Sequence, residues 1–384
     1  MTINNEHKKL NAPNLRFPEF QGEWEEYKLE DITAEIGDGI HATPIYDDNG
    51  TFYFVNGNNI SEYGITITES TQKVTAEEAL RNNASALNSY SILLSINGTI
   101  GNVALYKNEP IMLGKSACYI NVSSNINRNY IFYYLMMSKC QFYFTSELTG
   151  TTIKNLSLKS VRKTKVLLPN ANEQSKIARL FDAINERIAT QNKIIDKLQS
   201  LIKGISGRIF ASIQGIEYRM GDIASITNGD SNVQDAVTEP KDGLYPFFDR
   251  SEDIKYLSTY LFDKEAIIYP GEGAEFSPRY FKGKFALHQR CYAIFDFNEI
   301  INAQYLYFYL KTQNSYFVRN AVGSTVPSLR LDTFQKLKVV VPPKKIQYSV
   351  SLCLSSMEQK FNVENEILQM LLKQKQYLLR QMFI

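Results

Sequence analysis

The sequence predicts an α+β fold in which two mixed α/β heads are separated by two long antiparallel coiled-coil helices, arranged as an internal repeat with pseudo-two-fold symmetry. Three features predict this fold: a long apolar seam in the middle of the chain, a second seam of the same register at its end, and short apolar runs with Gly-, Asn- and Asp-rich turns before each seam. The length of 384 residues suits two domains.

The segment from Val166 to Phe210 is predicted to be mostly one long helix. Apolar residues recur there in alternating steps of four and three, which is typical of a coiled-coil seam. Asn172, which follows Pro169 closely, is expected to be its N-cap. The predicted seam consists of Ile177, Phe181, Ile184, Ile188, Gln191, Ile195, Leu198, Ile202, Ile205 and Ile209. A single helix cannot bury a seam of this length, so a partner helix is needed.

The partner is predicted to lie in the same chain, between Val339 and Ile384. A shift of 173 residues carries Pro169 onto Pro342 and the whole first seam onto a second one. The second seam consists of Val350, Leu354, Met357, Phe361, Glu364, Leu368, Leu371, Lys375, Leu378 and Met382.

The two seams share one polar position. Gln191 of the first seam falls on Glu364 of the second, and antiparallel pairing would bring these side chains together near the middle of both helices. A polar group at one seam position fixes the register of a coiled coil at some cost in stability. Lys375 is a further polar break that the first seam lacks.

The repeat extends into the heads. The same shift carries Cys118 onto Cys291 and Gly98 onto Gly271, whereas the shift near the start of each head is 191 residues. The first head is therefore expected to hold about 18 more residues between Gly39 and Leu94. The predicted segments are a first head, a central helix, a second head and a terminal helix, at residues 1–168, 169–212, 213–341 and 342–384.

Each head is predicted to contain a small twisted sheet and a tyrosine-rich helix. The tyrosine-rich segments, residues 130–138 and 305–313, are expected to lie in the core rather than to form a stacking surface for bases. The four cysteines, which show no C-x-x-C spacing, are expected to be buried small hydrophobes in a reducing compartment.

Composition and missing motifs narrow the function classes. The net charge of +2 neither indicates nor excludes nucleic acid, because binding depends on where the charge lies. Residues 1–10 hold no apolar signal segment, and no apolar run is long enough to span a membrane, so a cytoplasmic protein is expected. There is no P-loop and no H-E-x-x-H, and the histidines stand alone, so neither a catalytic site nor a metal site is expected.

Basic and amide side chains in loops and on one strand are candidate contacts to nucleic acid. Lys and Arg suit phosphates, and Arg or Asn can form paired hydrogen bonds with base edges. The alternative for each residue is an ordinary solvated surface or turn. The candidates are His41, Asn56, Asn58, Asn59, Lys115, Lys154, Arg162, Lys163, Arg250, Arg279, Lys282, Lys284 and Arg290.

Two short elements resemble a known family. They are "FPEFQGEW" (Phe17 to Trp24) and the pattern Pro-x-x-x-Glu-Gln-x-x-Ile, formed by Pro169, Glu173, Gln174 and Ile177. Together with the repeat, they resemble the DNA specificity subunit of a type I restriction-modification system, over the whole chain from about Asn14. The second helix departs from the pattern, because Ile346 stands where the first helix has Glu173.

The resemblance implies a division of labour. Each head would be a target recognition domain that reads one half of a split, asymmetric site in double-stranded DNA. The helices would be spacers that also dock two modification subunits, which carry S-adenosylmethionine and methylate adenine N6, and ATP-dependent restriction subunits would join the complex. This chain itself would hold no cofactor and contact no membrane, and "VPPK" (Val341 to Lys344) is no methyltransferase motif.

Two other classes of function compete with this interpretation. One is a self-contained DNA-modifying enzyme, which would bind S-adenosylmethionine without partner subunits. The other is a coiled-coil scaffold that does not bind DNA, which salt-sensitive retention on duplex DNA would argue against.

Overall fold

The computed structural model describes residues 11–82, 84–150 and 154–384. The N-terminal residues 1–10, for which no signal peptide is predicted, lie outside the described residues, as does His7. The chain forms two compact units, each made of one head and one half of each long helix. Unit 1 comprises residues 1–190 and 367–384, and unit 2 comprises residues 191–366.

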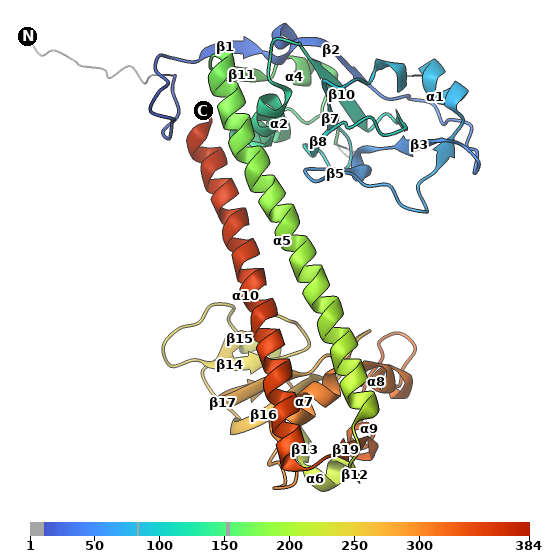
Figure 1. The fold of residues 1–384 in the computed structure, drawn as a ribbon, viewed down its shortest axis with the longest axis vertical. Helices are drawn as coiled ribbons and strands as arrows, with labels where there is room; N and C mark the ends of the chain where they lie inside the picture. The colour runs from blue at the N-terminus through green and yellow to red at the C-terminus, as the bar shows by residue number, and fades with distance from the viewer. Residues whose placement is uncertain (1–10, 83, 151–153) are drawn as a thin grey trace, which may run out of the picture. The chain divides into compact units, whose positions relative to one another are not determined.

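Two long helices, α5 (Ala171–Ser212) and α10 (Lys344–Met382), run through the units (Figure 1). The side chain of Asn170 accepts a hydrogen bond from the Glu173 amide at 3.0 Å, so Asn170 caps α5. The expectation that Asn172 is the N-cap is therefore wrong. The helix begins directly after Asn170, which places Asn172 within the first turn, where its backbone is already helical.

The helices pair antiparallel in both units, as predicted. In unit 1, Ile177 and Phe181 of α5 share a core with Leu379 and Met382 near the end of α10. In unit 2, the last part of α5 shares a core with the first part of α10. All twenty predicted seam side chains are buried or half-buried in the structure.

The polar seam position of unit 2 forms a hydrogen-bonded pair. The Gln191 amide nitrogen donates to the Glu364 carboxylate at 2.5 Å and to the Glu364 carbonyl at 2.9 Å, and each residue is only 7% exposed. Lys360 also pairs with this carboxylate. The hydrogen bonds from Lys360 and Gln191 lower the pKa of Glu364, which keeps the carboxylate charged within the seam.

The head of unit 1 contains two small sheets beside the long helices. One is a four-stranded antiparallel sheet in the order β2 (Thr33–Asp38), β10 (Ala117–Val122), β7 (Ser91–Ser95) and β8 (Val103–Leu105). The other has three strands in the order β6 (Lys73–Val74), β3 (Phe52–Val55) and β9 (Ile111–Leu113). Two strand pairs complete the head: β1 (Glu25–Lys28) with β11 (Lys165–Leu168), and β4 (Ile60–Ser61) with β5 (Gly64–Ile65).

The helices of this head are short. They are α1 (Ala76–Asn82), α2 (Arg128–Met136), α3 (Ser138–Ser146) and α4 (Leu158–Arg162), with 3-10 turns at Leu29–Ile32, Gly57–Asn59 and Ala84–Ala86.

The head of unit 2 builds the same plan into one six-stranded sheet. Its order is β13 (Ser225–Asn228), β18 (Cys291–Phe295), β16 (Phe262–Pro270), β17 (Arg279–Leu287), β14 (Tyr245–Phe248) and β15 (Lys255–Leu257). Its other elements are β12 (Ile216–Arg219), β19 (Lys338–Val341), α6 (Met220–Ile223), α7 (Ala303–Lys311), α8 (Asn314–Asn320), α9 (Leu331–Lys336) and a 3-10 turn at Val233–Asp235.

The two sheets differ because β17 is continuous. Its first part pairs with β16 and its last part pairs in parallel with β14. In unit 1 these two roles fall to separate strands, β8 and β9. Between them Asn108 has a positive φ of 65°, a conformation that ends a regular strand.

The repeat places Gly271 differently from the sequence prediction. The Leu329 amide donates to the carbonyl of Gly271, and the Leu156 amide donates to the carbonyl of Ile96 in the same way. Gly271 therefore corresponds to Ile96, and its predicted match with Gly98 is wrong.

The Gly39 and Gly229 amides donate to the carbonyls of Ala117 and Cys291, so the predicted match of Cys118 with Cys291 is also wrong, by one residue. Ala117 pairs with Ser95 as Cys291 pairs with Pro270, so the strand register is the same in both heads. Differences of one residue in the segments between strands therefore shift the repeat.

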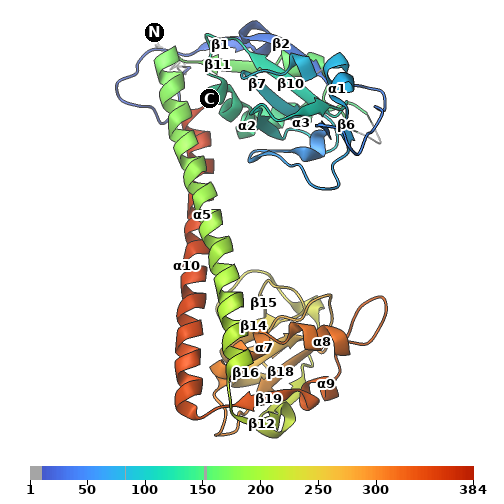
Figure 2. The same cartoon turned by 45° about the vertical axis from the view of Figure 1, so that its right-hand side comes forward.

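The tyrosine-rich segments lie in the core, as predicted, and they join each head to both long helices. Tyr130 of α2 donates to the Leu167 carbonyl at 2.7 Å, and its ring packs on Phe383 with centroids 5.2 Å apart. In unit 2, Tyr305 of α7 packs on Phe210 at the end of α5 with centroids 5.6 Å apart. Figure 2 shows α7 beside the end of α5. Each tyrosine-rich helix is thus covered by an aromatic residue at the end of a long helix: Phe210 in the last turn of α5, and Phe383 directly after α10.

The glutamine at the start of each long helix makes the same contacts in both units. The Gln174 amide donates to the Pro169 carbonyl at 2.8 Å and accepts from the Asn127 amide at 3.1 Å. Gln347 donates to the Pro342 carbonyl at 2.8 Å and accepts from the Asn302 amide at 2.7 Å.

The neighbouring glutamate is used only in the first copy. Glu173 is fully buried and forms two hydrogen bonds of 2.7 Å with Arg16. Arg16 also donates to the Gly22 carbonyl at 2.6 Å, so this ion pair fastens the N-terminal segment to α5. At the corresponding position of α10, Ile346 is exposed.

One cysteine departs from the expectation. Cys118, Cys140 and Cys291 are buried, but Cys353 is exposed. It directly precedes the seam residue Leu354 on α10, so its side chain turns away from the seam. Within the described residues, no helix is apolar over a length that would cross a membrane.

We predict that Arg16→Met destabilises unit 1 by about 3–5 kcal/mol, because it leaves the Glu173 carboxylate buried without a partner. Trp24, the single tryptophan, is buried in unit 1, so its fluorescence during urea unfolding reports this unit. The double variant Arg16→Met with Glu173→Ile should recover most of the lost stability. Equal unfolding midpoints for the single variant and the wild type would show that the pair has no such role.

Candidate functional site

Five loops of the first head meet at one end of its sheets, and we call them loop cluster 1. Ile40 pairs with Gly114 across two of these loops. The Ser116 hydroxyl donates to the Asn56 side-chain oxygen at 2.8 Å and accepts from the Gly57 amide at 2.8 Å. Loop cluster 1 comprises residues 38–41, 56–59, 97–99, 114–116 and 154–155.

Further contacts hold this cluster together. The Thr99 hydroxyl donates to the Gly57 carbonyl at 2.8 Å, and Asn97 pairs with Asn155. Gly39 packs so closely that an added Cβ would lie 2.2 Å from the Leu113 carbonyl oxygen, so only glycine fits there. The loops therefore form one connected surface.

The second head has the same arrangement, which we call loop cluster 2. Ser231 pairs with His288, and Glu272 pairs with Ser328. A Cβ added to Gly229 would lie 2.0 Å from the Leu287 carbonyl oxygen, which repeats the requirement at Gly39. Loop cluster 2 comprises residues 229–231, 249–252, 271–272, 288–290 and 328.

One backbone hydrogen bond aligns the two clusters. The Gly114 amide donates to the Val55 carbonyl at 2.9 Å, and the His288 amide donates to the Phe248 carbonyl at 2.9 Å. Residues 56–59 and 249–252, which directly follow these two carbonyls, are therefore the same loop in the two heads. The sequence alone does not align them, although each follows an aromatic run and begins with Asn or Asp.

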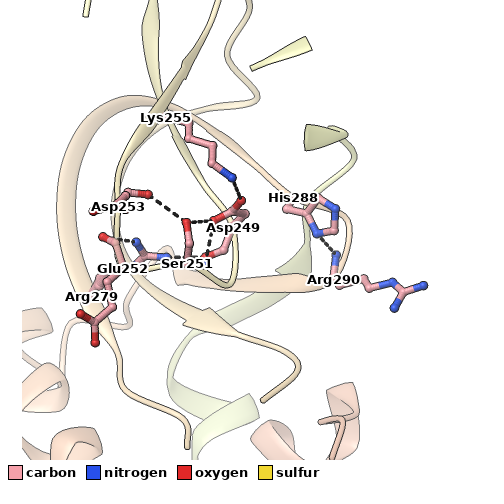
Figure 3. Close-up of polar contacts among 8 residues, drawn as sticks. All are labelled: Asp249, Ser251, Glu252, Asp253, Lys255, Arg279, His288 and Arg290. Carbon is pink, nitrogen blue, oxygen red and sulfur yellow. Dashed lines mark hydrogen bonds and ion pairs between the residues drawn. The ribbon is translucent and has the colours of Figure 1, made fainter. Parts of the chain in front are cut away.

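A buried carboxylate, that of Asp249, organises the loop of residues 249–252 (Figure 3). Asp249 accepts from the Ser251 amide at 2.8 Å, from the Ser251 hydroxyl at 2.6 Å and from the Lys255 ammonium at 2.6 Å. Burial alone would raise the pKa of Asp249, but the hydrogen bonds from Lys255 and Ser251 outweigh it and hold the pKa below its ordinary value.

Arg279 supports this loop from below. Its guanidinium lies 5.0 Å from the centroid of the Phe248 ring and donates to the carbonyls of Asp249 and Glu252. Burial lowers the pKa of Arg279, yet the charged form persists because arginine starts so high. These contacts occupy N–H groups that a nucleic-acid contact would need.

Four charged side chains surround His288. The pKa of His288 lies below its ordinary value, chiefly because the ring is partly buried. The charges of Arg290 and Arg250 lower this pKa further, whereas those of Asp249 and Glu272 raise it. Arg290 pairs with Glu272 at 2.7 Å but stays 62% exposed, and its guanidinium points away from the Asp249 loop (Figure 3). Arg250 and Arg290, which lie far apart in sequence, thus come together at one surface.

The structure gathers eight of the thirteen candidate residues into the two clusters. Loop cluster 1 contains His41, Asn56, Asn58, Asn59, Lys115 and Lys154, and loop cluster 2 contains Arg250 and Arg290. Some are engaged already: His41 pairs with Asp38 at 2.8 Å, and the Asn59 side chain accepts from the Asn56 amide at 3.0 Å. Among the described residues, the side chains of Asn58, Lys115, Lys154 and Arg250 are exposed without a hydrogen bond or ion pair.

The other five candidates lie outside the clusters. Arg162 of α4 donates to the Ile36 carbonyl at 2.6 Å, and Lys163 follows it. Lys282 and Lys284 face solvent on β17, with Lys284 4.7 Å from the Tyr260 ring centroid. Arg279 lies beneath loop cluster 2.

Two residues that organise the clusters, Ser116 and Asp249, were not candidates from sequence. The Ser116 hydroxyl bridges Asn56 and Gly57, and the Asp249 carboxylate bridges Ser251 and Lys255. The aromatic run that precedes Asp249 could have indicated it, whereas no local pattern marks Ser116. Within the described part of the chain, no group of His, Cys, Asp and Glu side chains is arranged to hold a metal ion.

Comparisons with known proteins agree on one family. The family described as "Type I restriction modification DNA specificity domain" matches residues 21–200 and 216–373. The EcoDI specificity subunit of Escherichia coli is 30% identical over 125 residues, which cover 32% of this chain and 26% of that subunit. The MjaIX specificity subunit of Methanocaldococcus jannaschii is 21% identical and is matched over 84% of both chains.

Solved structures share the fold. The S subunit of a type I restriction-modification system from M. genitalium superposes with a TM-score of 0.67 at 18% identity, over 97% of this chain and 99% of that one. A chain from a structure on assembly and conformational transition of the type I R-M system gives a TM-score of 0.55 at 14% identity, over 93% of this chain and 96% of that one. The family match spans most of both repeats, and the chain belongs to the type I restriction-modification DNA specificity subunits.

Proposed function

We propose that each head reads one half of a split, asymmetric site in double-stranded DNA, through its own loop cluster. One observation carries this proposal: the two loop clusters share the same backbone arrangement but present different side chains. The same bridges and close glycines recur in both clusters. Residues 56–59 are Asn-Gly-Asn-Asn, whereas residues 249–252 are Asp-Arg-Ser-Glu.

The chemistry of these side chains suits base reading. Asparagine can form two hydrogen bonds with adenine, and arginine can form two with guanine. The exposed side chains of Asn58 in loop cluster 1 and Arg250 in loop cluster 2 are free for such contacts, while Lys115 and Lys154 suit phosphates. Different side chains on equivalent loops would make the two half-sites differ.

The long helices would serve as the spacer. At about 1.5 Å per residue, the 42 residues of α5 form a rod of roughly 60 Å. A paired rod of this kind would hold the heads far enough apart for half-sites about one DNA turn from each other, 34–36 Å. The Gln191–Glu364 pair supports this role because it fixes the register of the helices.

The outer faces of the helices would dock the partner subunits. Several large apolar side chains of α10 are exposed outside the seam: Tyr348, Leu352 and Val363 in unit 2, and Met370 and Tyr377 in unit 1. Val363, Met370 and Tyr377 recur every seven residues, which is the spacing of a second helical contact face. We assign this face to two modification subunits, with restriction subunits joining the complex.

The chain would not perform the chemistry of methylation. In this proposal the modification subunits hold S-adenosylmethionine and transfer its methyl group to adenine N6. That transfer requires the target base to leave the duplex. The specificity subunit would select where this happens by fixing the position of the DNA relative to the modification subunits.

We predict that the chain with its modification subunits is retained on duplex DNA carrying its site, and that retention falls steeply with salt. The expected slope of log affinity against log salt is about −0.9 for each neutralised phosphate. The isolated chain should show no binding of S-adenosylmethionine in calorimetry. Binding of that cofactor to the chain alone would favour a self-contained enzyme, and a complex that ignores DNA would favour a scaffold.

We predict that Arg250→Ala weakens binding by about 1–3 kcal/mol at one base position of one half-site and leaves the other half-site unaffected. The measurement is competition among single-base variants of the site. Lys336→Ala, on the exposed surface of α9 in the same head, is the matched control and should change neither half-site. If Arg250→Ala weakened binding to all sequences equally, Arg250 would contact a phosphate instead of a base. If binding did not change, Arg250 would be an ordinary solvated surface residue.

A further inference from the structure

A lysine is buried within the helix seam of unit 1. Lys375 of α10 is only 4% exposed, and its ammonium pairs with the Glu62 carboxylate of the head. At the corresponding position of α5 the seam has Ile202. The packing of the helices alone therefore does not require a lysine, and a buried ammonium is costly unless it is paired.

Glu62 belongs to a segment that the second head lacks. It lies in the turn of the β4–β5 hairpin, within residues 56–72 that connect β3 to β6. The equivalent connection between β14 and β15 consists of residues 249–254 and contains no hairpin. The hairpin accounts for part of the additional length of the first head.

The hairpin continues directly from the loop of residues 56–59 in loop cluster 1. The Asn59 side chain donates to the Thr66 carbonyl at 3.0 Å, and the Thr66 amide donates to the Asn59 carbonyl at 2.8 Å. The Asn59 side chain also accepts from the Asn56 amide at 3.0 Å. A displacement of the hairpin would therefore be passed to residues 56–59.

The ion pair is the polar contact that fixes the hairpin against α10. Two cavities of about 440 and 460 Å³ include Glu62 and Tyr63 in their linings. One is also lined by Lys375 and Leu379 of α10, and the other by residues 182–189 of α5. Ile60 anchors the strands of the hairpin in the core of the head, and Asn102 donates to its carbonyl at 3.0 Å. The turn at Glu62 and Tyr63 instead borders open space on both sides, so the ion pair, rather than close packing, holds the turn against α10.

We propose that the Glu62–Lys375 pair positions residues 56–59 for base reading, so that Lys375 on the spacer helix is a specificity-determining residue for the first half-site. This proposal rests on the proposed function of loop cluster 1. Because the Lys375 ammonium is buried, it needs the Glu62 carboxylate beside it. This pairing fixes the position of the hairpin turn and, through it, that of residues 56–59, which directly precede the hairpin.

The test uses Lys375→Met in the full complex with its modification subunits. This substitution removes the buried charge and leaves an apolar seam like that at Ile202, so the helices still pair. We expect a loss of about tenfold in the preference for the cognate over single-base variants of the first half-site, with the preference at the second half-site unchanged. The measurement is the methylation rate on a panel of duplexes with one base changed at a time.

Three controls separate positioning from general stability. Ile202→Met, at the matching position of α5, should change neither preference. Lys375→Arg keeps the charge and should retain the wild-type preference. Exchanging the partners, Glu62→Lys with Lys375→Glu, should restore part of what each single change loses.

The outcomes are distinct. Loss confined to the first half-site and rescued by Lys375→Arg supports the positioning role. Unchanged preferences, or equal loss at both half-sites, overturn it and leave the pair as a stabilising contact. Methylation by the wild-type complex without any sequence preference would instead overturn the proposed function of the loop clusters.

Discussion

A buried glutamine at the first turn of each long helix holds helix and head together. Gln174 and Gln347 each bridge the carbonyl of the preceding proline and the amide of the asparagine that caps the tyrosine-rich helix. Buried amide groups are costly when unpaired, so these contacts favour one arrangement of helix and head. Because both copies use them, each head is joined to the start of its helix without a free hinge.

This junction allows the loops to vary while the frame stays the same. The frame is specified by glycines at close approaches, by parallel strand pairs and by the seam, and it recurs in both units. The loop side chains that it presents are different. Ser116 and Asn56 organise the first cluster, whereas Asp249, Ser251 and Lys255 organise the second. A repeated frame with divergent loops suits a protein that must recognise two different half-sites.

The sequence predicted the helices well because their signal is periodic. Two seams of ten positions each, with one matched polar position, are hard to explain by anything other than a pair of long helices. Asn170 was missed as the N-cap because Asn172 is also a suitable residue and the true helix start depends on one hydrogen bond. The match of Gly98 with Gly271 failed because the segments between strands differ in length by one residue at a time, and such small differences leave no gap that the sequence shows.

The candidate site was only partly predictable for a related reason. Residues 56–59 and 249–252 become equivalent through parallel strand pairs between distant segments, and no local pattern encodes such pairs. The sequence suggested Arg279 as a contact to DNA, yet its guanidinium donates to the carbonyls of Asp249 and Glu252. Lys375 looked like a defect of the seam, because its partner Glu62 lies 313 residues away.

The central claim is that one head reads one half-site. Methylome sequencing of a host that carries this chain with its modification subunits, before and after residues 1–165 are exchanged for those of a relative, tests it most directly. The account predicts that one half of the methylated sequence changes while the other half and the unread gap stay the same. A folded, active chimera whose methylated site changed in both halves, or in neither, would contradict it.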